Sequence, residues 1–303
     1  IGMVDNTDPV IVVGSGLMGI GIAHAFASSG FNTTLVDTNA DALENARSSI
    51  HGILDGGVKL GKVSAEDAEA AKNRLVTIER LSEAPADASL LVETVSENLT
   101  IKQSVVGEAA QLLDEDAIIA TNTSALSVTE IASVVPNPER VIGMHFFNPV
   151  HKMKLVELVL GIATDEKTVD RTRQWCESIG KTSILVNESP GLTTSRMSAM
   201  LGNEAMWMLH EGTASAEDID TALRMGFNHP MGPLELGDLT GWDTRLSVLK
   251  YLHSTLGEKF RPCPLIIKMV ASGRHGRKTG HGVYKYDEEG KRVPGSGLKG
   301  SNL

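Results

Sequence analysis

The chain has 303 residues, of which 41% are hydrophobic and 22% are charged, and its formal net charge is -10. This composition is that of an ordinary soluble globular protein, and the length predicts about two domains. The negative charge argues against nucleic acid as a partner, because non-specific binding to nucleic acid needs a basic face. No apolar run approaches the roughly 20 residues needed to span a bilayer, so we expect no membrane partner.

The N-terminus and the two cysteines favour a cytoplasmic protein. Ile1 and Gly2 precede Met3 and are expected to be a cloning remnant, so they do not enter the fold prediction. The N-terminus lacks the basic region, apolar stretch and small-residue cleavage site of a secretion signal. Cys176 and Cys263 are far apart and have no metal-ligand spacing, so we expect reduced thiols and no metal.

The first part of the chain, up to residue 188, alternates short apolar strands with amphipathic helices. This alternation predicts an α/β fold with a doubly wound, parallel sheet of the Rossmann type. Strands are expected at residues 10–13, 34–37, 74–78, 90–95, 117–121, 141–145, 154–160 and 183–186. Helices are expected between them, at residues 18–28, 40–54, 65–72, 101–112 and 167–179.

The rest of the chain, residues 189–303, has helical periods and predicts a second, all-helical domain hinged at Pro190 and Gly191. Helices are expected at residues 196–211, 216–224, 234–254 and 265–270, the second of them capped by Ser215. Residues 273–282 are a basic, glycine-rich loop that includes Lys278. The predicted boundary therefore separates residues 1–188 from residues 189–303.

A glycine motif lies where the first predicted strand meets the first predicted helix. Residues 14–19 read Gly-Ser-Gly-Leu-Met-Gly, which is the spacing G-x-G-x-x-G. Gly14 permits the tight turn, Gly16 lets the backbone approach a pyrophosphate, and Gly19 allows close packing of helix on strand. Leu17 and Met18 begin the helix, whose free N–H groups favour a phosphate. Glycine turns without a ligand are common, but a strand before and a helix after favour dinucleotide binding.

Asp37 closes the second predicted strand, 18 residues after Gly19. An acidic side chain at this position accepts hydrogen bonds from both ribose hydroxyls of an adenosine and repels a 2′-phosphate. The sequence therefore predicts NAD rather than NADP as the cofactor.

A histidine and a glutamate lie in the apolar runs that follow. His145 ends a predicted strand, ahead of an Asn-Pro pair that cannot extend it, and Glu157 lies within another apolar run, so its charge needs a partner. The two side chains can meet across adjacent strands, where the carboxylate would fix the tautomer of the imidazole and raise its basicity. A structural ion pair is the simpler explanation. The dinucleotide motif in the same domain instead favours a general acid–base pair.

Residues 121–126, Thr-Asn-Thr-Ser-Ala-Leu, follow another predicted strand. The hydroxyl of Ser124 and the amide of Asn122 are therefore expected at the carboxyl edge of the sheet, where open α/β folds bind ligands. The alternative is the start of a helix, because Ser127 and Glu130 have the spacing of a capping box. Both explanations hold together if Ser127 caps the helix and Ser124 faces the substrate.

Taken together, these motifs resemble those of the L-3-hydroxyacyl-CoA dehydrogenase family, particularly its short bacterial 3-hydroxybutyryl-CoA members. The resemblance covers nearly the whole chain. It rests on the glycine motif, Asn122-Thr123-Ser124, the His-Phe-Phe-Asn-Pro run at 145–149, Glu157 and the His-Pro-Met-Gly-Pro run at 229–233. It implies an NAD-binding Rossmann domain, a helical C-terminal domain that makes a homodimer, and an active site between them.

The resemblance also implies an activity, the reversible NAD-dependent oxidation of a short-chain L-3-hydroxyacyl-CoA to the 3-ketoacyl-CoA. It implies that His145 is the catalytic acid–base, that Glu157 orients it and that Ser124 hydrogen-bonds the acyl-CoA substrate. The residues expected to contact NAD, besides the glycine motif and Asp37, are Glu97, Lys102, Asn122, Asn148 and Lys278.

One position departs from the family pattern. The family commonly has an asparagine after the hinge, in the pattern P-G-F-x-x-N-R, which helps to bind the reacting oxygen. This chain has Ser195 there, which keeps a hydroxyl donor but is shorter. We expect Ser195 to belong to the catalytic set and to preserve activity with a modified acyl preference.

Two other functions stay open. The first is NAD-dependent dehydrogenation of a small free hydroxy acid, of the carnitine or sugar-acid type, for which Ser195 leaves room. The second is a non-catalytic NAD-binding protein. The presence of His145 with a buried Glu157 argues against it, because an unused buried carboxylate costs stability.

Overall fold

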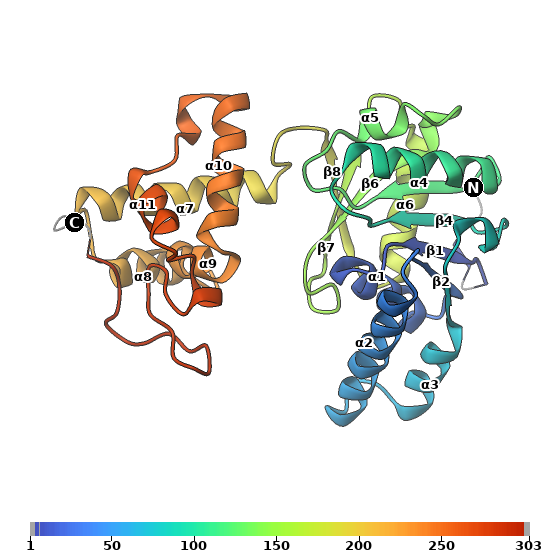
Figure 1. Cartoon of the computed structure of the whole chain (residues 1–303), viewed down its shortest axis with the longest axis horizontal. Coiled ribbons are helices and arrows are strands. Elements are labelled where there is room, and N and C mark those ends of the chain that lie inside the picture. Colours follow the sequence, from blue (N-terminus) through green and yellow to red (C-terminus); the bar gives the residue numbers. More distant parts are fainter. Residues whose placement is uncertain (1–3, 6, 300–303) are drawn as a thin grey trace. The chain divides into compact units, whose positions relative to one another are not determined.

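The computed structural model of the protein describes residues 4, 5 and 7–299, so the expected remnant at Ile1 and Gly2 lies outside the described residues. The chain divides into two compact units, and the division lies between Glu188 and Ser189. We call them unit 1 and unit 2 and describe each by itself (Figure 1). None of the described helices is long and apolar enough to cross a membrane.

Unit 1 is built on an eight-stranded sheet with the strand order β3-β2-β1-β4-β5-β6-β7-β8. The strands are β1 (Val10–Val13), β2 (Thr33–Val36), β3 (Leu75–Ile78), β4 (Leu90–Glu93), β5 (Ile118–Thr121), β6 (Val141–Phe146), β7 (Leu155–Leu160) and β8 (Thr182–Asn187). Each expected strand is present, with its ends displaced by at most two residues. The predicted α/β fold with a Rossmann-type sheet is confirmed.

The expectation of an entirely parallel sheet is wrong at one edge. Strands β1 to β6 are parallel, but β7 runs antiparallel to β6, and β8 is parallel to β7. Only residues 147–154 connect β6 to β7. This connection is too short for the helical crossover that parallel neighbours require, so β7 must return antiparallel.

Helices cover both faces of the sheet. They are α1 (Leu17–Ser28), α2 (Ala40–Lys59), α3 (Ala65–Arg74), α4 (Leu99–Leu112), α5 (Val128–Ala132) and α6 (Glu166–Ser178), with short 3-10 turns at Leu81–Glu83 and Pro138–Arg140. Figure 1 shows α4 and α5 on the face opposite to α1, α2 and α3. Because both faces are covered, every residue of β1, β2, β4 and β5 is buried.

The strand order reverses between β1 and β4. The connections leave the sheet toward opposite faces at this point, which opens a crevice at the carboxyl ends of the two strands. Ligands of such folds bind in this crevice. It is therefore the part of unit 1 in which the predicted site residues are to be sought.

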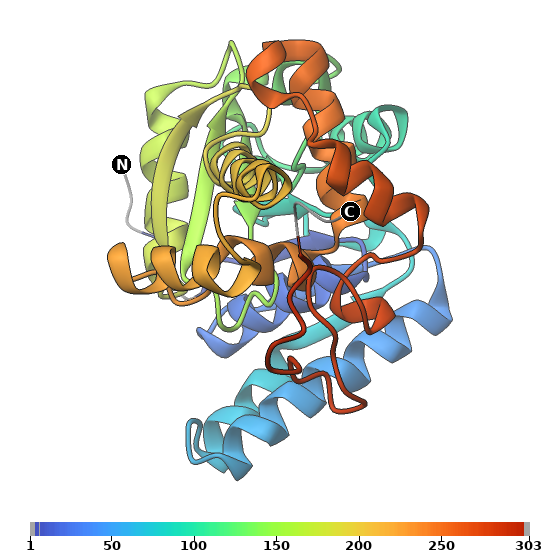
Figure 2. The same cartoon turned by 90° about the vertical axis from the view of Figure 1, so that its left-hand side faces the viewer.

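Unit 2 is helical, as predicted. Its helices are α7 (Thr194–Glu211), α8 (Ala216–Gly226), α9 (Pro233–Thr240), α10 (Trp242–Leu256) and α11 (Pro264–Ala271), with 3-10 turns at Glu258–Phe260 and Arg277–Thr279. Helix α7 contacts each of the other four, and Figure 2 views it nearly along its axis. The hydroxyl of Ser215 accepts a hydrogen bond from the Asp218 amide at 3.1 Å, so the predicted cap of α8 is confirmed.

The expected single helix at residues 234–254 is wrong, because the chain breaks at Gly241 into α9 and α10. Gly241 has a φ of 94°, a conformation that only glycine adopts without strain. The amide of Trp242 bonds to the carbonyl of His275 instead of continuing the helical pattern. The apolar period runs through the break, so the hydrophobic pattern gives no sign of it.

A buried carboxylate organises the C-terminal loop of unit 2. Asp238 is fully buried and accepts four hydrogen bonds, from the Trp242 indole, the amides of Val283 and Tyr284, and the Tyr286 hydroxyl. A Cβ at Gly276 would lie 2.2 Å from the Asp238 carbonyl oxygen. The glycine-rich stretch is therefore packed against α9.

Candidate active site

The glycine turn of unit 1 differs in its packing from one glycine to the next. A Cβ at Gly19 would lie 1.7 Å from the Gly14 carbonyl oxygen, and a Cβ at Gly14, where φ is 102°, would lie 2.8 Å from the Thr94 hydroxyl. A Cβ at Gly16 would meet nothing within 4 Å. The first and third glycines are thus required by packing, whereas the second leaves open space above the backbone.

The N-terminus of α1 completes a cradle that fits a pyrophosphate. Gly16 is the N-cap residue, and no side chain caps the helix. Leu17, the first helical residue, is 66% exposed. The uncapped N–H groups and the helix dipole face the open space above Gly16, which is the arrangement that binds dinucleotide phosphates.

Asp37 lies immediately after β2 and is fixed against the glycine turn. Its Oδ2 accepts hydrogen bonds from the amide and the hydroxyl of Ser15 at 2.8 and 2.7 Å, and its Oδ1 accepts one from the Asn39 amide at 3.0 Å. Burial alone would raise the pKa of this carboxyl, but the hydrogen bonds outweigh burial and hold the pKa below its ordinary value. A negative charge is therefore fixed beside the glycine turn, where the sequence predicts the ribose of the cofactor.

His145 and Glu157 meet as the sequence predicts. They lie directly opposite each other in the antiparallel β6–β7 ladder, and the His145 Nδ1 is 2.7 Å from the Glu157 Oε2. Glu157 is fully buried, and His145 is 8% exposed. Because a carboxylate oxygen accepts, Nδ1 carries the proton, and Nε2 is left as the basic nitrogen. The ring of Phe147 lies beside the imidazole, with centroids 4.8 Å apart.

The residues after β5 form a short loop, 122–126, at the same edge. The Asn122 Oδ1 accepts a hydrogen bond from the Phe146 amide at 2.9 Å, which ties the loop to the end of β6 beside the histidine. Ser124 is exposed. Ser127 is the N-cap residue of α5, and its hydroxyl accepts a hydrogen bond from the Glu130 amide at 3.0 Å, so the predicted N-cap is confirmed.

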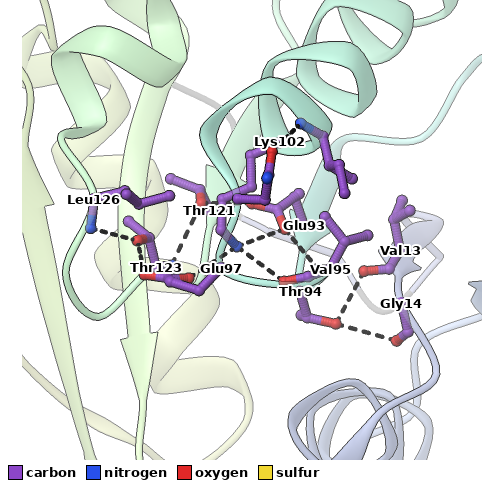
Figure 3. A network of polar contacts seen from close by, with 12 residues as sticks. Val13, Gly14, Glu93, Thr94, Val95, Glu97, Lys102, Thr121, Thr123 and Leu126 are labelled. Carbon is purple, nitrogen blue, oxygen red and sulfur yellow. Dashed lines mark hydrogen bonds and ion pairs between the residues drawn. The ribbon is translucent and has the colours of Figure 1, made fainter.

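Glu97 fastens this loop from the β4–α4 connection (Figure 3). Its Oε1 accepts hydrogen bonds from the Thr123 hydroxyl and from the amides of Ser124 and Ala125, the latter two at 3.1 Å. Burial would raise the pKa of Glu97, but the Thr123 hydrogen bond and the nearby Lys102 ammonium outweigh burial and lower it. The carboxylate therefore holds the loop in its ionised form.

Lys102 points inward, although the resemblance implies that it contacts NAD. Its side chain is 1% exposed, and its Nζ lies 2.9 Å from the Glu93 Oε1 and 3.3 Å from the Glu97 Oε2. Glu93 is fully buried at the end of β4 and was not among the predicted site residues. The sequence does mark Glu93 as a candidate, because it is an acidic residue at the end of an apolar run.

The remaining predicted residues are distributed over both units. Asn148 is exposed in the loop after β6. Ser195 and Lys278 belong to unit 2, where Ser195 is the second residue of α7. The Lys278 Nζ forms an ion pair with the Asp243 Oδ2 at 2.7 Å.

Unit 1 has a Rossmann sheet, an uncapped glycine turn with a carboxylate fixed beside it, and a histidine–carboxylate pair at one sheet edge. These features are those of an NAD-dependent dehydrogenase. The comparisons with known proteins give the family. The family model "3-hydroxyacyl-CoA dehydrogenase, NAD binding domain" matches residues 9–189, and the model of the C-terminal domain of the same family matches residues 191–286. The chain belongs to the 3-hydroxyacyl-CoA dehydrogenase family, as the sequence resemblance indicates, and its cofactor is NAD.

Individual relatives agree with the family models. A 3-hydroxybutyryl-CoA dehydrogenase from Bradyrhizobium diazoefficiens is 41% identical over 91% of this chain and 94% of its own length. A probable 3-hydroxybutyryl-CoA dehydrogenase from Bacillus subtilis is 41% identical over 92% of this chain and 98% of its own length. The crystal structure of (S)-3-hydroxybutyryl-CoA dehydrogenase from Ralstonia eutropha has a TM-score of 0.88 at 38% identity, covering 93% of this chain and 100% of that one.

Proposed function

We propose that the protein catalyses the reversible oxidation of a short-chain L-3-hydroxyacyl-CoA, such as 3-hydroxybutyryl-CoA, to the 3-ketoacyl-CoA. The names of the relatives at 41% identity support this substrate class. The observation that carries the chemistry is the 2.7 Å contact between His145 and a fully buried Glu157 at the carboxyl edge of the sheet.

In the proposed reaction, the Nε2 of His145 accepts the proton of the substrate 3-hydroxyl group. Bound NAD supplies the acceptor for the hydride that leaves the same carbon. Glu157 keeps the proton on Nδ1 and stabilises the imidazolium once the ring is protonated. In the reducing direction the imidazolium returns this proton to the keto oxygen.

Hydroxyl groups are proposed to orient the acyl-CoA. Ser124 is exposed on a loop that is tied to the end of β6, so its hydroxyl is free to bind a substrate oxygen near the histidine. Ser195 replaces the asparagine of the family pattern and is proposed to donate a single hydrogen bond. We propose that Glu97, Lys102, Asn122, Asn148 and Lys278 serve the cofactor side of the site, as the resemblance implies.

The test is NADH oxidation with acetoacetyl-CoA and, separately, with free acetoacetate. Turnover of the thioester alone is expected. His145→Gln should reduce kcat by about a hundredfold or more, and Glu157→Gln should also reduce it, because general acid–base catalysis contributes roughly 10²–10⁴-fold. The matched control is His151→Gln, six residues after His145 in the connection from β6 to β7, and it should retain activity. Turnover of acetoacetate, or full activity of His145→Gln, would contradict the proposal.

We further propose that unit 2 makes a homodimer. Large apolar side chains are exposed on it, among them Met197 (65%), Met225 (77%) and Phe227 (75%). Met225 and Phe227 lie two residues apart at the end of α8, and adjoining exposed apolar residues are typical of an interface with another protein. Sedimentation should give a dimer for the native chain and a monomer for the double variant Met225→Glu/Phe227→Glu; a native monomer would refute the proposal.

A further inference from the structure

Three charged residues next to the 122–126 loop, Glu93, Lys102 and Glu97, form a connected series of contacts that starts at Glu93. This residue ends β4 and is fully buried. Its Oε1 accepts hydrogen bonds from the Val95 amide at 2.6 Å and the Lys102 ammonium at 2.9 Å, and its Oε2 accepts one from the Thr121 hydroxyl at 2.6 Å. Both oxygens of this buried carboxylate are thus occupied, by donors from α4, from β5 and from the connection after β4.

Lys102 continues this series of contacts from the buried Glu93 toward the partly exposed Glu97. Its ammonium has three acceptors, namely the Glu93 Oε1, the Val95 carbonyl at 3.1 Å and the Glu97 Oε2 at 3.3 Å. The ammonium has three N–H donors, so each of them has an acceptor in this set. The Lys102 ammonium is therefore held between two carboxylates (Figure 3).

Glu97 is the last residue in this series of contacts, and its side chain is 39% exposed. One of its oxygens faces Lys102, and the other receives the Thr123 hydroxyl and the amides of Ser124 and Ala125. The Thr123 hydroxyl in turn accepts the Leu126 amide at 2.9 Å. The backbone on both sides of the Ser124 side chain is thereby bonded to a carboxylate whose own position depends on Lys102.

The fold alone does not require these charges. The other residues of β4 are aliphatic and equally buried, and an aliphatic residue would fill the place of Glu93 without the cost of burying an ion. A buried ion pair adds little stability compared with a pair of apolar side chains, although removing one of its two partners destabilises the fold strongly. The charges are better explained by the loop that they fix, because hydrogen bonds to charged groups are about twice as strong as neutral ones.

We propose that Glu93 is a positioning residue of the active site. Through Lys102 and Glu97 it fixes the backbone that carries Ser124, and through Thr121 it fixes the point where the same loop leaves β5. This proposal rests on the proposed function, in which Ser124 binds the acyl-CoA oxygen. Glu93 and Thr121 touch neither substrate nor cofactor and act through the loop.

Four variants test the proposal. Glu93→Gln removes the charge at constant shape, Lys102→Met removes the ammonium, and Thr121→Val removes one hydroxyl. Thr121→Ser keeps that hydroxyl and should rescue the valine variant. The matched control is Gln103→Met, because Gln103 is the neighbour of Lys102 on α4 but donates to the Glu130 carbonyl, outside this set of contacts.

Three measurements separate the possible results. Amide hydrogen exchange over 122–126, measured by mass spectrometry without substrate or cofactor, should accelerate about tenfold or more in the three loss variants and stay unchanged in the control. The kcat/KM for acetoacetyl-CoA should fall roughly tenfold to a hundredfold, since small displacements of a positioning group have such effects. The Kd of NADH should change by less than about threefold in Glu93→Gln and in Thr121→Val, because neither residue belongs to the proposed cofactor set.

The double variant Glu93→Gln/Lys102→Met should match the single variants, because both act through one set of contacts. Unchanged exchange at 122–126, or faster exchange with unchanged kcat/KM, would overturn the proposal. A loss confined to NADH affinity in Glu93→Gln and Thr121→Val would also overturn it. If the native enzyme does not turn over acetoacetyl-CoA, the proposed function fails, whereas faster exchange in the variants would still support the positioning of the loop.

Discussion

His24 makes unit 1 sensitive to acid, and its replacement offers a quantitative test of the structure. This residue lies in α1, half-buried, with its ring 6.2 Å from that of His151. Its Nε2 is 3.3 Å from the Ser28 hydroxyl, and its Nδ1 is buried without a hydrogen-bond partner. Burial, with His151 and the Lys181 ammonium, lowers the pKa of His24 from 6.5 to about 4.

The sign of the effect follows from the two pKa values. In the folded protein His24 binds its proton only near pH 4, whereas in the unfolded chain it does so near pH 6.5. Its contribution to stability is therefore fully present above pH 6.5 and is lost as the pH falls through about 4. At about 1.36 kcal/mol per pH unit between these values, the loss amounts to about 3 kcal/mol.

The variant His24→Gln cannot take up this proton, so the free energy of unfolding of its unit 1 should fall less between pH 6.5 and pH 4 than that of the native protein. The two pH profiles should diverge by about 3 kcal/mol at the acid end. Other titrating groups cancel in the difference. The assay is urea unfolding of protein labelled with 5-fluorotryptophan, followed by fluorine NMR at each pH.

The label reports on each unit separately. Trp175 lies in α6 of unit 1, fully buried against Phe26 and Phe31, with ring centroids 6.0 and 5.1 Å away. Trp242 lies in unit 2 and serves as the internal control, since its unfolding should be the same in both proteins. If the two profiles of unit 1 stayed within about 1 kcal/mol of each other down to pH 4, the reasoning about His24 would be refuted.

Three further predictions follow from the packing of single residues. Gly16→Ala should keep the stability of unit 1 but weaken NADH binding about tenfold. Gly19→Ala, whose Cβ would lie 1.7 Å from the Gly14 carbonyl oxygen, should lose both stability and binding. Calorimetry and NADH titration distinguish the two variants, and equal behaviour would contradict the packing argument. Asp238→Asn in unit 2 places an amide NH2 group against N–H and O–H donors and should lower the free energy of unfolding in urea by about 3 kcal/mol or more. A loss below about 1 kcal/mol would be incompatible with the four hydrogen bonds that Asp238 accepts. Asp37→Ser should narrow the preference for NADH over NADPH about tenfold in kcat/KM, and an unchanged ratio would remove Asp37 from cofactor selection.

Much of the fold could be predicted because its strands are apolar runs bounded by turn residues. β1 and β5 illustrate this, since every residue of both is buried and their ends are marked by Gly14 and by the polar residues after Thr121. The errors have a different physical origin. The break at Gly241 depends on the hydrogen bond from the Trp242 amide to the carbonyl of His275, 33 residues further along, and the direction of β7 depends on the length of a loop. Neither feature interrupts the local hydrophobic pattern.

The site could be predicted where its residues break a pattern in the sequence. Glu157 was found because it is an acid within an aliphatic strand. Lys102 gives the same kind of signal, because it lies on the buried stripe of α4 with Val106 and Ala109. The sequence does not predict that Glu93, nine residues earlier, is the partner of Lys102. This pairing depends on where the turn before α4 brings the helix back to the sheet.

The buried charges of unit 1 separate into two kinds, which connects the site to the stability of the fold. Arg140 and Lys181 donate to backbone carbonyls, Arg140 to those at the end of α4 and Lys181 to that of Met153, and so satisfy main-chain groups. Glu93 with Lys102 and Glu157 with His145 instead pair one side chain with another. Both pairs lie at the carboxyl edge, on either side of β5. Because each buried ion costs several kcal/mol of desolvation, the concentration of both pairs around the 122–126 loop indicates that this edge is built for rigidity at the reacting groups.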